Sequence, residues 1–206
     1  MTRLLRVAAV AVLVGGATAV LTSCSSDPGG IVTESPSPTV VVTTPSPSPT
    51  ASVTSEEELL AQIPENARGE DFQSASNFAK FFWSQYPRLF DDGDSDGTTA
   101  SLWHMISDES CEFCDSALSS SREVADAGQH RSGNEFDWSS ELGTGGLVND
   151  GFTYVNLDGT ISDVQTFDSE GDVVEEEAGF EGTFGVQLRY EQDHWVVFGA
   201  EFQIHE

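Results

Sequence analysis

Apolar side chains recur at every third or fourth position between residues 71 and 90. The stripe consists of Phe72, Ala75, Phe78, Ala79, Phe82, Trp83, Tyr86, Leu89 and Phe90. This spacing predicts an amphipathic helix. Such a stripe is typical of packing against a core rather than of an aromatic box that binds a ligand.

Three shorter helices are predicted around this one. Ser55 is followed three residues later by a glutamate, which is the spacing of a capping box, so a short helix begins there and ends near Pro64. A second helix contains Trp103, and a third begins near Ser107 and ends at Gly128. The predicted helices therefore all precede the predicted strands.

From residue 135 onward the hydrophobic period changes from about 3.6 residues to about 2. Residues 136–138 alternate between apolar and polar, and residues 152–157 form a predicted strand. The Asp-Gly pair at residues 158–159 is a strong signal for a two-residue hairpin turn. It predicts a reversal into a second strand over residues 161–167.

The clearest alternation of apolar and polar positions lies in residues 180–190. A turn at Gln192 and Asp193 returns the chain as a strand over residues 195–204. Helices followed by an antiparallel meander predict an α+β fold, with the helices packed on one face of the sheet. We expect a single domain over residues 56–206.

The N-terminus has the three parts of an export signal. Arg3 and Arg6 form the positive region, residues 7–20 are apolar, and Leu-Thr-Ser precedes Cys24. The apolar run is shorter than the ~20 residues of a membrane-spanning helix. An ordinary signal peptide with an incidental cysteine remains an alternative. We expect a lipoprotein signal peptide over residues 1–23 and a lipid on Cys24.

That lipid would hold the protein at the extracellular face of the cell membrane, because a diacyl or triacyl group buries more than one chain. Residues 25–55 are almost wholly Ser, Thr, Pro, Val and Gly, and they cannot bury enough apolar surface to fold. In polyproline II they would reach roughly 95 Å, at ~3.1 Å per residue. Residues 24–55 are therefore predicted to be the lipidated cysteine and a disordered linker.

The formal net charge is −27 at pH 7, and it becomes −29 when residues 1–23, with Arg3 and Arg6, are removed. A field of that sign repels nucleic acid and anionic headgroups, and it attracts divalent cations or basic partners. The sequence has no basic patch of the kind that phosphate binding needs. We expect no nucleic-acid partner. Acidity that only keeps an exported domain soluble is the simpler interpretation.

Cys111 and Cys114 are the only cysteines of the predicted domain. Export favours disulfides, and two Cα atoms three residues apart on a helical turn lie ~5 Å from each other, within bridging range. A thiol redox pair would lack its usual strand–helix–strand context, and a zinc site would lack two further ligands. We predict a structural disulfide, with the redox and metal interpretations as alternatives.

Asp92, Asp94 and Asp96, followed by Gly97, reproduce the first half of an EF-hand calcium loop between two predicted helices. Position twelve, which should be a bidentate glutamate, is Trp103. Calcium is the one cofactor that the sequence suggests. A solvated acidic loop is the alternative.

The strand over residues 195–204 offers one candidate carboxylate for a pocket. With a two-residue loop, Tyr190 pairs with Trp195 and Phe184 pairs with Glu201. Glu201 would then be the one acid among apolar neighbours, and desolvation would favour its protonated form, as a general acid requires. The opposite face of this strand is also apolar, and a one-residue bulge would turn Glu201 outward.

Several of these features occur together in a known group of proteins. The signal peptide with its cysteine, the Ser/Thr/Pro linker, Ile63-Pro64, the aromatic helix of residues 78–83 and the Cys-Glu-Phe-Cys motif at residues 111–114 resemble a family of uncharacterised actinobacterial lipoproteins. Three helices before a sheet that ends in Trp-Val-Val resemble the nuclear transport factor 2-like (SnoaL-like) cone. The resemblance covers roughly residues 64–206. It implies a curved, cone-like sheet and brings no catalytic residue with it.

No nucleophile elbow, phosphate-binding loop, dinucleotide fingerprint or HExxH motif occurs in the sequence. We expect a membrane-anchored extracellular lipoprotein with a non-catalytic domain that binds an unknown small ligand or a cell-envelope component, or that has a structural role. Two alternatives stay open, because fold alone cannot choose between them. One is an isomerase- or cyclase-type enzyme that uses Glu201, and the other is a calcium-dependent envelope module.

Overall fold

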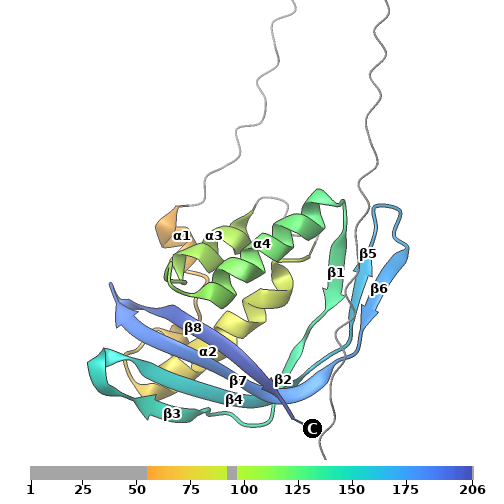
Figure 1. Cartoon of the computed structure of the whole chain (residues 1–206). Coiled ribbons are helices and arrows are strands. Elements are labelled where there is room, and N and C mark those ends of the chain that lie inside the picture. The colour runs from red at the N-terminus through yellow and green to blue at the C-terminus, as the bar shows by residue number, and fades with distance from the viewer. Residues whose placement is uncertain (1–54, 92–96, 206) are drawn as a thin grey trace, which may run out of the picture. The chain divides into compact units, whose positions relative to one another are not determined.

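The computed structural model describes residues 55–91 and 97–205. The predictions for residues 1–54, which include the signal peptide, the lipid on Cys24 and nearly all of the linker, lie outside the described residues. The described part is an α+β domain with helices on one face of antiparallel sheets, as the sequence predicts (Figure 1). No helix in it is long and apolar enough to cross a membrane.

Three of the four α-helices of the described residues begin at a capping side chain. The four helices are α1 (Glu56–Leu60), α2 (Phe72–Arg88), α3 (Thr98–Met105) and α4 (Glu112–Asp126), with short 3-10 turns at Glu65–Ala67 and Asn149–Gly151. The capped helices are α1, α2 and α4. The predicted capping box is confirmed, since Ser55 and Glu58 each accept a hydrogen bond from the other's backbone N–H. Asp71 caps α2 by accepting from the Ser74 N–H at 2.9 Å.

The strands form two antiparallel sheets, and neither sheet is closed. The main sheet has the order β2-β4-β7-β8, with β3 also paired to β4, and the small sheet has the order β1-β5-β6. The strands are β1 (His130–Gly133), β2 (Phe136–Trp138), β3 (Thr144–Leu147), β4 (Thr153–Ile161), β5 (Val164–Phe167), β6 (Val173–Glu177), β7 (Phe180–Glu191) and β8 (His194–Ile204). The predicted turn between β7 and β8 is confirmed, with φ of +49° at Gln192 and +67° at Asp193.

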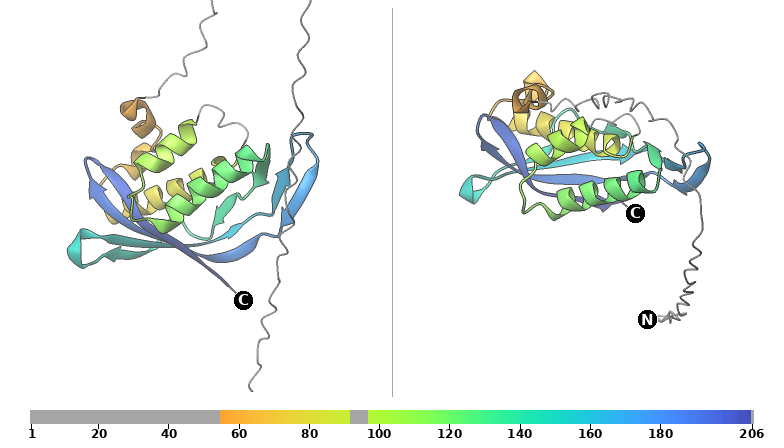
Figure 2. Two further views of the ribbon diagram at one scale, coloured as in Figure 1. Left: turned by 45° about the horizontal axis from the view of Figure 1, so that its top comes forward. Right: turned by 90° about the horizontal axis from the view of Figure 1, so that it is seen from above.

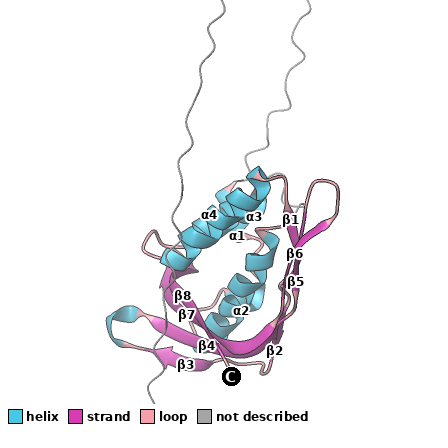
Figure 3. Cartoon of the chain, turned by 45° about the vertical axis from the view of Figure 1, so that its right-hand side comes forward, coloured by secondary structure: helices cyan, strands magenta, loops and turns pink. Residues whose placement is uncertain are grey.

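Three pairs of consecutive strands pass from one sheet into the other through a bend, and the helices lie inside it (Figure 3). β1 leads into β2, β4 into β5, and β6 into β7. Glycines permit the close approach there: a Cβ on Gly133 would collide with the carbonyl oxygen of Asp163, and one on Gly179 with that of Ile161.

The hairpin predicted at Asp158 and Gly159 is wrong. β4 runs without interruption through both residues and bends into β5, and the chain reverses only at residues 168–172, between β5 and β6. Gly159 lies opposite Trp138, and a Cβ on it would be 2.9 Å from Cε3 of that indole. The glycine therefore makes room for a neighbouring ring rather than for a turn.

The helix predicted to begin near Ser107 begins instead at Glu112. The preceding backbone pairs with β8: the Asp108 N–H donates to the Val197 oxygen at 2.8 Å, and the Val197 N–H donates to the Ile106 oxygen at 2.8 Å. This extended pairing cannot coexist with helical hydrogen bonds, so α4 starts one turn later.

The core lies between the helices and the inner face of the main sheet, with α2 against β4 and α4 against β8 (Figure 2). Its largest wholly buried side chains are aromatic: Trp83, Trp103, Phe78, Phe82 and Phe184. The Trp83 ring centroid lies 5.4 Å from that of Phe184, and Phe82 stacks on Trp103 at 4.4 Å. The aromatic helix thus provides the core stripe that its spacing predicts.

Candidate functional site

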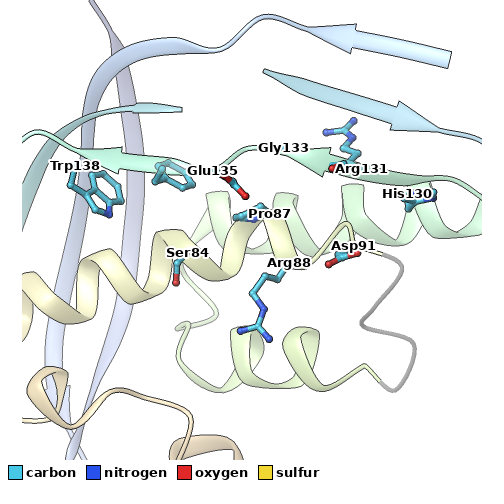
Figure 4. Close-up of a pocket in the computed structure, with 11 residues that line it drawn as sticks. Ser84, Pro87, Arg88, Asp91, His130, Arg131, Gly133, Glu135 and Trp138 are labelled. Carbon is cyan, nitrogen blue, oxygen red and sulfur yellow. The ribbon is translucent and has the colours of Figure 1, made fainter. Parts of the chain in front are cut away.

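An open pocket of about 490 Å³ lies beside the core, between the second half of α2 and strands β1 and β2 (Figure 4). The helical side contributes Ser84, Pro87, Arg88 and Asp91. The strand side contributes His130, Arg131, Ser132, Gly133, Glu135, Phe136 and Trp138. The lining combines charges of both signs with aromatic rings, which is typical of sites for small polar ligands.

Phe136 and Trp138 form the aromatic wall of this pocket. Their rings are stacked, with centroids 5.1 Å apart and an interplanar angle of 13°, and both side chains are half-buried. Phe136 also packs edge-on against Phe184, at 5.1 Å between centroids. The wall is therefore fixed to the core and presents an apolar surface of defined position.

Two of the eight basic residues of the chain lie at this pocket. The Nη1 of Arg88 donates to the Gln85 amide oxygen at 3.2 Å. The Arg131 guanidinium lies 4.9 Å from the centroid of the Phe90 ring, and its Nε is buried without a hydrogen-bond partner in the described structure. A buried donor of that kind is a place where water or a ligand can bind.

Glu135 provides a negative charge on the opposite side of the pocket. Its side chain points toward α2, whereas Arg88 extends from α2 away from the strands (Figure 4). The stacking of the His130 ring on Phe167, with centroids 5.2 Å apart, holds a further titratable group at the rim. Separated charges of both signs favour a ligand that is itself polar or zwitterionic.

The pocket lacks a nucleophile paired with a base. Ser84 Oγ donates to the backbone oxygen of Phe81 at 2.6 Å, and no hydrogen bond joins a serine to a histidine or carboxylate among the residues described around the pocket. Nucleophilic catalysis needs such a contact to activate the hydroxyl. Among the residues described around the pocket, no serine has such a contact.

The interior of the described domain contains no buried carboxylate. Its buried polar residues are Ser74, Ser76, Gln85, Thr99, Ser121, Asn134, Thr153, Thr166 and His194. Tyr86 is the notable titratable group of the core, and desolvation raises the pKa of its hydroxyl, partly opposed by the charge of Arg131.

The pairing predicted for Glu201 is wrong. The register of β7 and β8 shifts by one residue after Leu188 and Val197, so Phe184 pairs with Phe202 and Gly185 pairs with Glu201. Glu201 is exposed and faces away from the helices. The alternative, a bulge that turns Glu201 outward, is therefore the observed arrangement.

The bulge has a physical cause on the outer face of the sheet. Phe198 is the additional residue, and its ring packs edge-on against Phe152 with centroids 5.2 Å apart. Arg189 lies over both rings, 4.0 Å from the Phe152 centroid and 4.8 Å from the Phe198 centroid. This cation–π contact holds Phe198 outward and shifts every later residue of β8 to the opposite face.

The sulfur atoms of Cys111 and Cys114 lie 2.10 Å apart, which is the distance of a disulfide, with the Cα atoms 5.2 Å apart. Both residues are buried at the start of α4, where the Trp103 indole N–H donates to the Cys114 oxygen at 3.1 Å. Enclosed sulfur atoms fit the structural interpretation better than the redox one, because redox pairs need exposure.

The calcium candidates Asp92, Asp94 and Asp96 lie outside the described residues. Among the residues that are described, no group of three or more His, Cys, Asp or Glu side chains could hold a metal ion. The metal interpretation of the two cysteines therefore lacks the further ligands that zinc requires.

Sequence reasoning missed the pocket beside α2. It assigned Trp138 to a strand, correctly, but it gave no role to Arg88 or Glu135, which are 47 residues apart in the chain. The one signal in the sequence was that the chain has only eight Lys and Arg residues. Two of these eight lie at this pocket. The packing of β1 against α2, with the Arg131 N–H donating to the Phe90 oxygen at 2.8 Å, brings these residues together, and the residues of β1 were not predicted to be a strand.

Comparisons with known proteins leave the family open. No protein-family model matches the sequence, and a search of curated proteins finds no match. Among solved structures, the chain is similar to the intermembrane space region of the chloroplast protein ARC6, with a TM-score of 0.48, 11% identity, and coverage of 66% of this chain and 98% of that one. It is also similar to Aln2 from a Streptomyces species, with a TM-score of 0.37, 16% identity and coverage of 62% and 87%.

A periplasmic fragment of TraM is similar at a TM-score of 0.37, with 9% identity and coverage of 63% of this chain and 97% of that one. All three scores are below 0.5, so these similarities carry no argument about activity. They leave the α+β architecture, which the domain itself displays, as the level at which this chain is classified.

Proposed function

We propose that this chain is a lipoprotein at the extracellular face of the cell membrane, whose folded domain binds a ligand or an envelope component without catalysis. One observation carries the non-catalytic part: aromatic rings fill the space between helices and sheet, and no Asp or Glu is buried in the described domain. An isomerase- or cyclase-type site needs a desolvated acid–base group in that space.

The sequence of the N-terminus supports the proposed location. Arg3 and Arg6, the apolar residues 7–20 and the Leu-Thr-Ser-Cys motif ending at Cys24 have the order that lipoprotein processing requires. A composition rich in Ser, Thr and Pro suits a spacer between a lipid anchor and a domain. No nucleic-acid partner is proposed, because the net charge is strongly negative.

At a finer level, we propose a nuclear transport factor 2-like cone and membership of a family of uncharacterised actinobacterial lipoproteins. The order of elements supports the cone: α2, α3 and α4 precede the strands and lie inside the bend of the antiparallel sheets. The motifs at residues 63–64 and 111–114 support the family. In this domain the interior of the cone is occupied by side chains, so its ligand binds beside the core.

The pocket next to α2 is the ligand site that this proposal names. Arg131, whose Nε is buried without a hydrogen-bond partner in the described structure, and Glu135 provide charges of opposite sign, and Trp138 provides an apolar wall. A small molecule with a carboxylate, an ammonium group and an apolar portion, such as a free amino acid or a short peptide, would satisfy all three.

The location is tested by lipid labelling in cells that process lipoproteins. A fatty acid carrying an alkyne should label the original chain, and Cys24→Ala should lose the label and be released to the medium. Ser25→Ala is the matched control, since it leaves the cysteine in place. If Cys24→Ala still partitions into detergent like the original chain, the anchoring proposal is wrong.

The pocket is tested by thermal shift with free amino acids and dipeptides. A member of this panel should raise the melting temperature of the chain, because it binds the folded state only. Arg131→Ala should remove the shift, because it removes the unpartnered donor of the pocket. Arg122→Ala should preserve it, because Arg122 is exposed on α4 and outside the pocket. A shift that survives Arg131→Ala, or no shift with any member of the panel, contradicts the assignment of this site.

A further inference from the structure

A second hollow lies on the opposite side of the main sheet, on the face turned away from the helices. It has a volume of about 220 Å³ and crosses β4, β7 and β8. Two rows of paired residues form it: Tyr154, Gln187 and Gly199 in one row, and Asn156, Gly185 and Glu201 in the other. We call this surface the outer groove. Because its residues belong to paired strands, their backbone positions are rigid relative to one another.

Glycines form the floor of the outer groove. A Cβ on Gly185 would lie 3.0 Å from Asn156 Oδ1 and 3.5 Å from Glu201 Cγ. A Cβ on Gly199 would lie 3.5 Å from Gln187 Oε1. Each missing side chain thus leaves a space bordered by polar groups, and a ligand can approach the sheet there more closely than elsewhere.

The polar groups around that space have no partners within the described protein. The Tyr154 hydroxyl, the Asn156 and Gln187 amides and the Glu201 carboxylate make no hydrogen bond or ion pair there. These four groups provide donors and acceptors on three adjacent strands.

The rows on either side of the outer groove differ from it. On one side, Thr183 Oγ1 donates to Asp158 Oδ1 at 2.6 Å and is 2.9 Å from His205 Nε2. On the other side, Arg189 is 3.2 Å from Glu191 and lies over Phe152. The side chains of Thr183, Asp158, Arg189 and Glu191 in the neighbouring rows are therefore engaged with each other, whereas the polar side chains of the groove are not.

We propose that the outer groove binds a neutral sugar ring of a glycan. The exposed ring of Tyr154 can stack on the apolar C–H face of a pyranose. Pairs of adjacent hydroxyls can accept from the amides and donate to the amide oxygens and to Glu201. The groove is smaller than the ~300 Å³ at which sites for drug-sized ligands begin, so it suits a single ring.

The charges in and around the groove favour a neutral sugar over a charged one. The groove contains one carboxylate and no unpaired cation, and the whole chain is strongly negative. An anionic sugar would be repelled, while one carboxylate among neutral amides is too little to select a polycationic peptide. This inference goes beyond the proposed function, because it assigns a different ligand to a different face.

The test is an NMR titration of the full chain carrying Cys24→Ala, which cannot be lipidated. The probes are methyl glycosides of glucose, mannose, galactose and arabinose, with glucuronate, glucosamine and oligolysine as charged comparators. At least one neutral glycoside should give saturable shifts at the backbone amides of Asn156, Gly185 and Gly199, with a Kd of about 1 mM.

Variants separate the groove from its surroundings. Gly199→Ala should weaken binding at least about tenfold while the fold persists, because its methyl group fills the floor at an ordinary contact distance of 3.5 Å. Glu201→Gln and Tyr154→Ala should weaken it too, without depending on the backbone of Gly199. Thr160→Ala is the control, because Thr160 is exposed on β4 outside the groove.

Three results overturn the proposal. One is the absence of saturable shifts at the groove with every neutral glycoside. A second is shifts that cluster instead at Glu135 and Trp138, which would place the sugar in the pocket beside α2. The third is binding restricted to glucosamine or oligolysine, which would make the ligand class cationic. Release of Cys24→Ala from membranes is independent of all three, so the proposed location can fail or hold separately.

Discussion

The two faces of the main sheet both carry aromatic side chains, but these differ in burial and in contacts. On the inner face, Phe184 is 1% exposed and packs against Trp83, Phe136 and Trp138. On the outer face, Tyr154 is 42% exposed, and no aromatic ring of the described residues packs against it. Both are aromatic side chains on neighbouring strands. The Phe184 ring is packed in the core, whereas the Tyr154 ring can contact a ligand.

The polar groups differ between the faces in the same way. Few polar side chains are buried on the inner side, and no carboxylate is among them in the described domain. The outer groove collects amides, a hydroxyl and a carboxylate without internal partners. An unpaired polar group is costly when it is buried, whereas an exposed one is hydrated by water until a ligand replaces that water. The candidate ligand sites of the described domain therefore lie on its surfaces.

The largest effect that the comparison predicts concerns stability. Phe184→Ala should lower the free energy of unfolding by about 3–5 kcal/mol, because it leaves a cavity among packed rings. Tyr154→Ala removes a ring of similar size from the outer face and should change it by less than about 0.5 kcal/mol. Urea unfolding followed by tryptophan fluorescence measures both. Equal losses would mean that the two faces are not energetically distinct.

The periodicity of apolar residues along the sequence predicted most of this fold. The stripe of residues 71–90 became α2 with its core face, and the alternation of residues 180–190 became β7. These predictions succeed because burial of many side chains at one period outweighs local preferences. The Asp-Gly pair at residues 158–159 misled for the opposite reason: a local turn signal gave way to the packing of Trp138 over Gly159.

The candidate sites were less predictable than the fold. The side on which Glu201 lies depends on one residue, Phe198, which the contact with Arg189 holds outward. Two-residue periodicity carries no information about such a bulge, because both faces of this strand are apolar in sequence. The pocket beside α2 joins residues of a helix and two strands, and the outer groove joins residues of three strands, so their positions follow from tertiary packing and strand pairing rather than from local spacing.

A second, smaller effect is expected where both faces end at the bend between the sheets. Gly179→Ala places a methyl group against the carbonyl oxygen of Ile161, so one strand must shift, and we expect a loss of about 1–3 kcal/mol. Gly199→Ala is the matched change on the outer face, where the new methyl group meets Gln187 at 3.5 Å and nothing must move. Thermal melting of the two variants compares them. A Gly199→Ala loss as large as that of Gly179→Ala would contradict the open floor of the outer groove.

The smallest expected effect depends on pH and compares Tyr86, on the helical side of the sheet, with Tyr154 on its outer face. Desolvation raises the pKa of the Tyr86 hydroxyl in the folded chain, with the charge of Arg131 lowering it in part and that of Glu177 raising it. In the unfolded chain the hydroxyl titrates near its ordinary value of ~10. The unfolded state therefore loses its proton first, and folding stability falls as the pH rises from about 10 through the higher pKa of the folded state.

Replacing that hydroxyl removes this contribution and little else, because phenylalanine keeps the contacts of the Tyr86 ring with Phe90 and Phe113. Tyr86→Phe should therefore lose less stability above pH ~10 than the original chain, while the two chains behave alike near neutral pH. Tyr154→Phe, on the outer face, retains the buried hydroxyl and should follow the original chain throughout. Urea unfolding at a series of pH values compares the three chains. Parallel alkaline losses in all of them would show that the Tyr86 hydroxyl is no more desolvated than an outer one, and the distinction between the faces would then rest on packing alone.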